Sequence, residues 1–185
     1  MCVGKLRTAS TAVVALIGIS IIAQHAVEGS GRLVRSEPAA RALPILTNAD
    51  LAIPVTGIER AALRDSFSAK RKGHVHAAID ILAPRGTPVL SAADGIVTKL
   101  RAGGTGGLTV YINDAIGTEY YYAHLDHYAA WLHEGMPVRR GDVIAYVGTT
   151  GNAPPQTPHL HFAIEQNGAP VDPYPVLIAR GQTIR

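Results

Sequence analysis

The chain has 185 residues, of which 47% are hydrophobic and 17% charged, and its formal net charge is +3. This length suits one domain with a sizeable core, and the low charged fraction excludes a disordered, highly charged chain. The positive excess lies in residues 1–42, where five basic residues outnumber two acidic ones, while the other twelve basic and twelve acidic residues cancel. We therefore expect no nucleic-acid partner, because such a protein needs clustered lysine and arginine on its binding face.

The N-terminal segment has the pattern of an export signal. Lys5 and Arg7 precede an apolar run from Thr11 to Ala23, as the charged region of a signal peptide precedes its apolar region. Residues 1–29 are expected to form a cleaved signal peptide. The alternative is an uncleaved helix that anchors the protein in the inner membrane through residues 8–27, although the run is shorter than the roughly 20 residues of a typical span. Either reading places the remaining protein outside the cytoplasm, in the periplasm or secreted.

The only cysteine, Cys2, precedes this apolar run, so the exported part has no cysteine. Disulfide bonds and thiolate chemistry are thereby excluded from that part. Residues 30–50 have the composition of a linker, and residues 51–185 are expected to form one domain.

The predicted elements of this domain are short and mostly strands. A short helix is expected over Ile58–Phe67, and a single helical turn over Tyr128–His133. Asp94-Gly95 is a hairpin signal. Turn signals about every ten residues favour a mainly β fold, an antiparallel sandwich or barrel with one or two short helices. Apolar alternation predicts strands at Ile79–Leu82, Pro88–Ser91, Ile96–Leu100, Leu108–Ile112, Glu119–Ala123, Val143–Val147 and Leu160–Ile164.

The histidines carry the main chemical signal. On a strand, His159 and His161 share one face at a spacing of about 6.5–7 Å, so one imidazole can bind a metal while the other handles a proton. The alternative is a polar strand face with two exposed histidines. His76 and Asp80 would lie about 13 Å apart in a straight strand, so sharing an ion requires the chain to curl before Ile79.

His124 follows a strand and is a further candidate for the site. The alternative interpretation is that it is a partly buried histidine bonded to the backbone. Together these residues offer two imidazole nitrogens and a carboxylate, a set that suits catalytic zinc with an open fourth position, and leave two histidines for acid–base work. A serine hydrolase is disfavoured because no Gly-x-Ser-x-Gly elbow occurs. The Gly103–Gly107 run is better explained as a hairpin turn than as a phosphate cradle.

Two further runs have plain structural explanations. The basic run Lys70-Arg71-Lys72 is expected in a solvated loop, with contact to an anionic polymer as its alternative. Tyr120-Tyr121-Tyr122 is expected to alternate between core and surface, with one hydroxyl that could face a groove.

Several short motifs follow one another between residues 53 and 176. They are His76-Ala-Ala-Ile-Asp80, Gly86–Gly95, Tyr122-Ala-His-Leu125, Gly141–Ile144, Val147–Gly151 and Pro158-His-Leu-His-Phe162. Their combined order resembles that of the lysostaphin/LytM-type zinc endopeptidases of bacterial cell walls.

The resemblance implies a function and a site. It makes His76, Asp80 and His161 the ligands of one zinc ion, with water as the fourth ligand, and His124 and His159 the catalytic histidines. It implies an antiparallel β fold with a groove over the zinc, and hydrolysis of peptide bonds in peptidoglycan, either in cross-links or in stem peptides. It does not identify the bond cleaved or a regulatory protein partner.

The chain also departs from the family pattern. Alanine stands at positions 77 and 78, where glycine is usual at one, and residues 66–75 lack the tyrosine to which some members assign oxyanion stabilisation. The main alternative is an inactive cell-wall-binding relative that activates an amidase, but such relatives lack ligands that are all present here. A lipoyl or biotinyl carrier, suggested by Gly135–Ile144, would need a lysine at a hairpin tip, whereas Lys99 lies inside a predicted strand.

Overall fold

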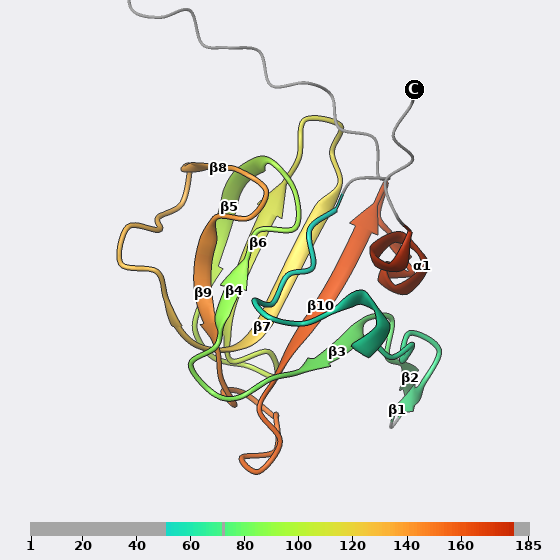
Figure 1. Cartoon of the computed structure of the whole chain (residues 1–185). Coiled ribbons are helices and arrows are strands. Elements are labelled where there is room, and N and C mark those ends of the chain that lie inside the picture. The colour runs from blue at the N-terminus through green and yellow to red at the C-terminus, as the bar shows by residue number, and fades with distance from the viewer. Residues whose placement is uncertain (1–50, 72, 180–185) are drawn as a thin grey trace, which may run out of the picture. The chain divides into compact units, whose positions relative to one another are not determined.

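The computed structural model describes residues 51–71 and 73–179 (Figure 1). The predicted signal or anchor (1–29) and the linker (30–50) lie outside the described residues. Within the described ranges the chain forms mainly antiparallel β-structure with a single short α-helix, which confirms the predicted fold class. None of the helices in this part of the chain is both long and apolar enough to cross a membrane.

Nine of the described strands form one branched antiparallel sheet. The main path runs β11-β10-β7-β6-β5-β8, while β3 pairs with β10, and β9 pairs with both β7 and β4. The strands are β3 (Ile79–Leu82), β4 (Pro88–Leu90), β5 (Gly95–Arg101), β6 (Leu108–Asn113), β7 (Glu119–Tyr128), β8 (Pro137–Val138), β9 (Val143–Val147), β10 (His159–Gln166) and β11 (Ala169–Val171). A separate two-stranded hairpin, β1 (Lys70–Arg71) and β2 (His74–Val75), precedes β3.

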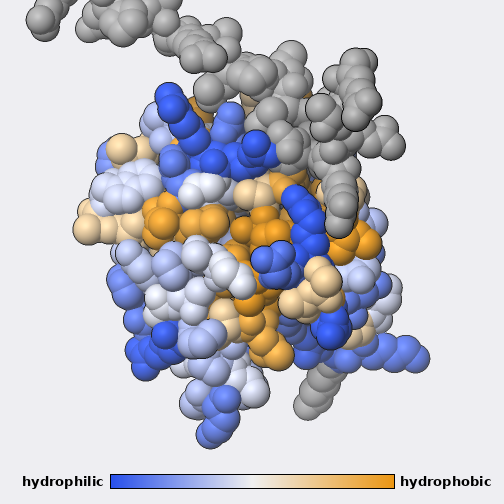
Figure 2. All heavy atoms as spheres, in the orientation of Figure 1, coloured by the Kyte–Doolittle hydropathy of each residue, from blue (hydrophilic) through white to orange (hydrophobic). Residues whose placement is uncertain are grey.

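The core forms on one face of β7 and β10. Tyr120 and Tyr122 are buried while Tyr121 is half-exposed, so the predicted alternation of the tyrosine run is confirmed. Tyr122 packs against Phe162 with ring centroids 5.2 Å apart, and its hydroxyl accepts a hydrogen bond of 2.9 Å from the Ala92 amide. Burial of these rings drives the packing of β10 against β7. On the face shown in Figure 2, hydrophobic residues gather near the middle of the domain.

Two predicted helical segments are wrong. Over Ile58–Phe67 the chain forms only the short 3₁₀ helix η2 (Arg60–Ala62), because Leu63 turns to extended backbone and buries its side chain in the core. Tyr128–His133 is not helical either: β7 continues to Tyr128, and a turn follows in which the Leu132 amide donates to the Ala129 carbonyl.

The one α-helix among residues 51–71 and 73–179 lies after β11. Two features of its N-terminus stabilise this helix, α1 (Pro173–Ile178). The Asp172 side chain accepts a hydrogen bond from the Tyr174 amide at 2.9 Å, and Pro173 occupies the first turn. Leu177 anchors the helix in the core.

The hairpin predicted at Asp94-Gly95 is also wrong. β4 pairs with β9, whereas β5 pairs with β6 and β8. A two-residue turn of the Asp-Gly type requires a positive φ at the glycine. Gly95 is not among the described residues with a positive φ. The glycine instead permits close strand approach, since a Cβ there would lie 2.6 Å from the Asn113 carbonyl oxygen. The Gly103–Gly107 run does form the predicted hairpin turn, between β5 and β6.

Candidate metal centre and groove

Strand pairing and one sharp turn bring three predicted ligands together. β3 and β10 are antiparallel neighbours, and their register places Asp80 opposite His161. His76 precedes β3, and Ala77 adopts a φ of 55° in the left-handed region. The chain therefore curls before Ile79, as the spacing of His76 and Asp80 required.

The three ligand atoms form a compact triangle. His76 Nε2 lies 3.0 Å from His161 Nδ1 and 3.0 Å from Asp80 Oδ1, and His161 Nδ1 lies 3.1 Å from Asp80 Oδ1. Zinc bonds of about 2.0–2.1 Å in a tetrahedron place ligand pairs about 3.3 Å apart. The donors therefore fit one face of a zinc tetrahedron, and the three residues are half-buried.

Hydrogen bonds around this triangle fix the ligand orientation. His76 Nδ1 lies 3.0 Å from the Ser66 carbonyl oxygen, which can accept only if Nδ1 carries the proton. His76 Nε2 is then the nitrogen with a free lone pair, as metal-binding histidines require. The Asp80 amide donates to Ser66 Oγ at 3.2 Å.

The charges favour a metal-binding protonation state. Burial lowers the pKa of His76 below its ordinary value of 6.5, although the hydrogen bond to Ser66 and the Asp80 charge oppose this shift. Burial would raise the pKa of Asp80, but the hydrogen bond from His161 and the nearby His76 outweigh it and lower the pKa to about 2. At neutral pH the centre therefore offers a neutral His76 and an ionised Asp80.

A bulge in β7 turns His124 toward the same centre. By strict alternation His124 would point into the core with Tyr120 and Tyr122, but the register with β6 shifts nearby, and His124 has a φ of 61°. Its amide donates to the Gly106 carbonyl at 2.8 Å, and its Nδ1 lies 2.9 Å from the Thr150 carbonyl oxygen. Such bulges re-aim side chains beside functional sites.

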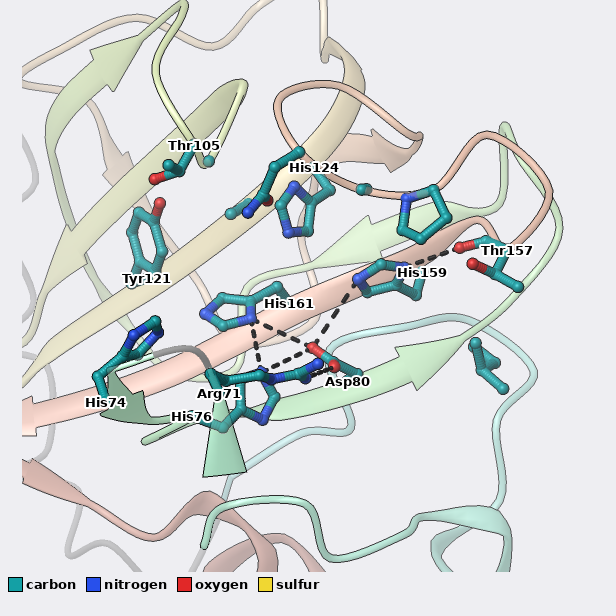
Figure 3. A pocket seen from close by; sticks show the side chains of 16 residues that line it. Arg71, His74, His76, Asp80, Thr105, Tyr121, His124, Thr157, His159 and His161 are labelled. Carbon is teal, nitrogen blue, oxygen red and sulfur yellow. Dashed lines mark hydrogen bonds and ion pairs between the residues drawn. The ribbon is translucent and has the colours of Figure 1, made fainter. Parts of the chain in front are cut away.

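His159 completes the group from the neighbouring end of β10. Its Nδ1 lies 2.8 Å from the Thr157 carbonyl oxygen, so Nε2 is the free nitrogen, and Nε2 lies 3.9 Å from Asp80 Oδ1. The His124 ring centroid is 5.0 Å from that of His159 and 5.6 Å from that of His161. The structure thus brings all five predicted site residues together (Figure 3).

These residues line a groove with a volume of about 760 Å³. Sequence reasoning missed Arg71 and named the tyrosine run only as an alternative groove contact. Arg71 donates from Nη2 to Asp80 Oδ2 at 2.7 Å, although the basic run was expected in a solvated loop. Tyr121 also lines the groove, and burial followed by the neighbouring Tyr111 raises its pKa to about 12. The only sequence signal was the alternation that separates Tyr121 from its buried neighbours.

Comparison with known proteins identifies the family. The profile of peptidase family M23 matches residues 74–173, which is more than half of the chain. The chain belongs to this family, whose members depend on zinc, and the predicted resemblance is confirmed. The match begins at β2, just before His76, and ends at the start of α1.

Three relatives show how far the likeness extends. The DD-carboxypeptidase/endopeptidase Mpg of Neisseria meningitidis is 45% identical over 105 residues, which are 56% of this chain and 23% of the relative. The peptidoglycan DD-endopeptidase ShyC of Vibrio cholerae is 32% identical over 109 residues, 59% of this chain and 24% of the relative. The catalytic domain of lysostaphin from Staphylococcus simulans superposes with a TM-score of 0.55 and 25% identity, covering 64% of this chain and 94% of that domain. The chain thus spans about a quarter of the length of the two enzymes it matches in sequence.

Proposed function

We propose that the protein is a zinc-dependent endopeptidase that hydrolyses peptide bonds of peptidoglycan, in cross-links or in stem peptides. One observation carries this proposal: three half-buried ligand atoms lie 3.0–3.1 Å apart beside two further histidines, each with a free Nε2. The family consists of peptidases, and the relatives from Neisseria and Vibrio are named for endopeptidase activity.

Each residue has a role in this proposal. His76, Asp80 and His161 would hold the ion. When bound, zinc acts as a Lewis acid and lowers the pKa of a water molecule to about 7. His124 and His159 would face this position, and the backbone-bonded Nδ1 of each leaves its Nε2 available. One of the two would take a proton from the attacking water and return it to the leaving amine.

The groove geometry favours the hydrolase over the amidase-activating alternative. An activator needs no intact metal centre, whereas here the two additional rings lie 5.0 Å apart and next to the ligands. We also propose that residues 1–29 direct export, and that residues 51–185 act on the cell wall outside the cytoplasm.

Digestion of purified sacculi, combined with metal analysis, tests the function. The purified protein should contain one zinc per chain and solubilise peptidoglycan. A protein that neither binds zinc nor digests sacculi, but stimulates a purified amidase, would replace this proposal with the activator reading.

A further inference from the structure

Arg71 is the feature of the groove that the proposed mechanism does not use. It lies on the β1–β2 hairpin, next to the predicted ligand His76, and its side chain is 44% exposed. Figure 3 shows it beside Asp80, on the same side of the groove as His74 and His76.

The charges that line the groove are unequal. Asp80 is the only carboxylate among the described lining residues, and Arg71 is the only guanidinium. The single negative charge already faces three imidazoles and Arg71. A divalent ion in the centre would leave the groove with a net positive charge. Such a groove attracts an acidic ligand and disfavours a cationic one.

Arg71 has donors to spare for such a ligand. Of its guanidinium atoms only Nη2 has an acceptor within the described part of the chain, namely Asp80 Oδ2 at 2.7 Å. The planar guanidinium carries five N–H groups, and its geometry matches a carboxylate. Asp80 therefore holds the group in place while other donors stay accessible from the groove.

Other residues of the groove lining are apolar. Leu82 pairs with His159 across β3 and β10, and its side chain is an exposed hydrophobic on the groove wall. Ala153 and Pro154 also line the groove. The groove lining thus combines a cationic group beside His76 with several apolar residues.

We propose that Arg71 is a substrate-binding residue that pairs with a free carboxylate of the peptide beside His76 in the groove. The substrate class is then an acidic peptide, such as a wall stem peptide with free carboxylates, rather than a neutral glycine bridge. This inference rests on the proposed peptidase function and adds the basis of its selectivity.

The test compares two peptides with several variants. One peptide is a cross-linked stem peptide with free carboxylates beside the scissile bond, and the other is the same peptide with those groups converted to carboxamides. The unaltered protein should show a kcat/KM about tenfold higher for the acid, in line with a charge-assisted hydrogen bond. Arg71→Ala should bring the ratio near one by slowing only the acid, and Arg71→Lys should keep part of the preference.

Lys70→Ala is the matched control. It removes the same charge from the adjacent position of β1, but Lys70 does not line the groove, so the ratio should be unchanged. Zinc content and zinc affinity, measured by chelator competition, separate substrate binding from an effect through Asp80. An Arg71→Ala protein that loses zinc, or that slows equally on both peptides, would overturn the inference.

The affinity of the protein for each peptide, measured by calorimetry, distinguishes a failure of the Arg71 inference from a failure of the proposed peptidase function. If the unaltered zinc-loaded protein cleaves neither peptide, the peptidase proposal fails. Tighter binding of the acid that is lost in Arg71→Ala would still support the role of Arg71, and equal binding of acid and amide would refute it.

Discussion

His159 and His161 lie two residues apart on one strand, and we propose different roles for them because their surroundings differ. His161 Nδ1 contacts Asp80, whereas His159 Nδ1 faces the Thr157 carbonyl. His161→Ala should therefore lose zinc, while His159→Ala should retain zinc and lose about 10²–10⁴-fold in hydrolysis. Metal analysis and a sacculus digest measure the two effects. His127→Ala is the control, because His127 stacks on Tyr146 outside the groove. Normal digestion by His159→Ala would refute its assignment.

The pH dependence of zinc binding should reflect His76. Burial lowers its pKa below 6.5, so its neutral, metal-binding form persists through pH 6.5 and is lost as the pH falls through the lowered folded-state value. Asp80, with a pKa of about 2, stays ionised over this range. Zinc occupancy after dialysis at a series of pH values should decline only below pH 6.5. Release centred at or above pH 6.5 would contradict this account.

At the residue scale, the types of the candidate ligands could be predicted from the sequence, but the residues that contact these ligands could not. His-x-His and His-x-x-x-Asp are local patterns, so their chemistry was visible in the sequence. Arg71 contacts Asp80 nine positions away, through a hairpin whose placement depends on tertiary packing. Its proximity to the centre could not be predicted from a basic run alone.

At the element scale, the position of His124 depends on the turn between β5 and β6. Gly107 has a φ of 68°, and a Cβ there would lie 2.3 Å from Thr150 Oγ1 and 2.4 Å from the Gly151 amide nitrogen. Gly107→Ala should therefore displace the Thr150 backbone that holds His124 Nδ1. We expect a loss of about 1–3 kcal/mol in the free energy of unfolding, and reduced hydrolysis with zinc retained.

Gly103→Ala is the comparison for this prediction. Gly103 lies in the same turn with a φ of 108°, but a Cβ there meets nothing within 4 Å. The Gly103→Ala variant therefore measures the effect of backbone strain alone, without a steric clash. Chemical denaturation and hydrolysis of sacculi measure both variants. Equal activities for the two would show that the close approach at Gly107 does not position His124.

Strands themselves were well predicted, whereas bulges were not. Alternation located most of β3, β6, β9 and β10 because period-two burial is a local property. The bulge that re-aims His124 breaks this period at a non-glycine residue, and strict alternation would assign His124 to the core. Backbone contacts with Gly106 and Thr150, distant in sequence, stabilise the unusual conformation.

At the scale of the whole domain, strand order creates the centre. β10 lies between β3 and β7, so Asp80, His161 and the β7 bulge meet although they are far apart in the sequence. Strand order was beyond the local signals, as the failed hairpin at Asp94-Gly95 shows: β4 and β5 each find other partners. The family resemblance supplied what local pattern could not, namely which histidines are proposed to share an ion.

The central claim is that this centre uses zinc to cleave peptide bonds of the cell wall. Mass spectrometry of the products released from defined sacculi, with and without a zinc chelator, tests it most directly. We predict muropeptides with new amino and carboxyl termini within stems or cross-links, their loss with the chelator, and their return when zinc is added. Zinc-loaded protein that releases no such peptides, or releases them equally in excess chelator, would contradict the claim.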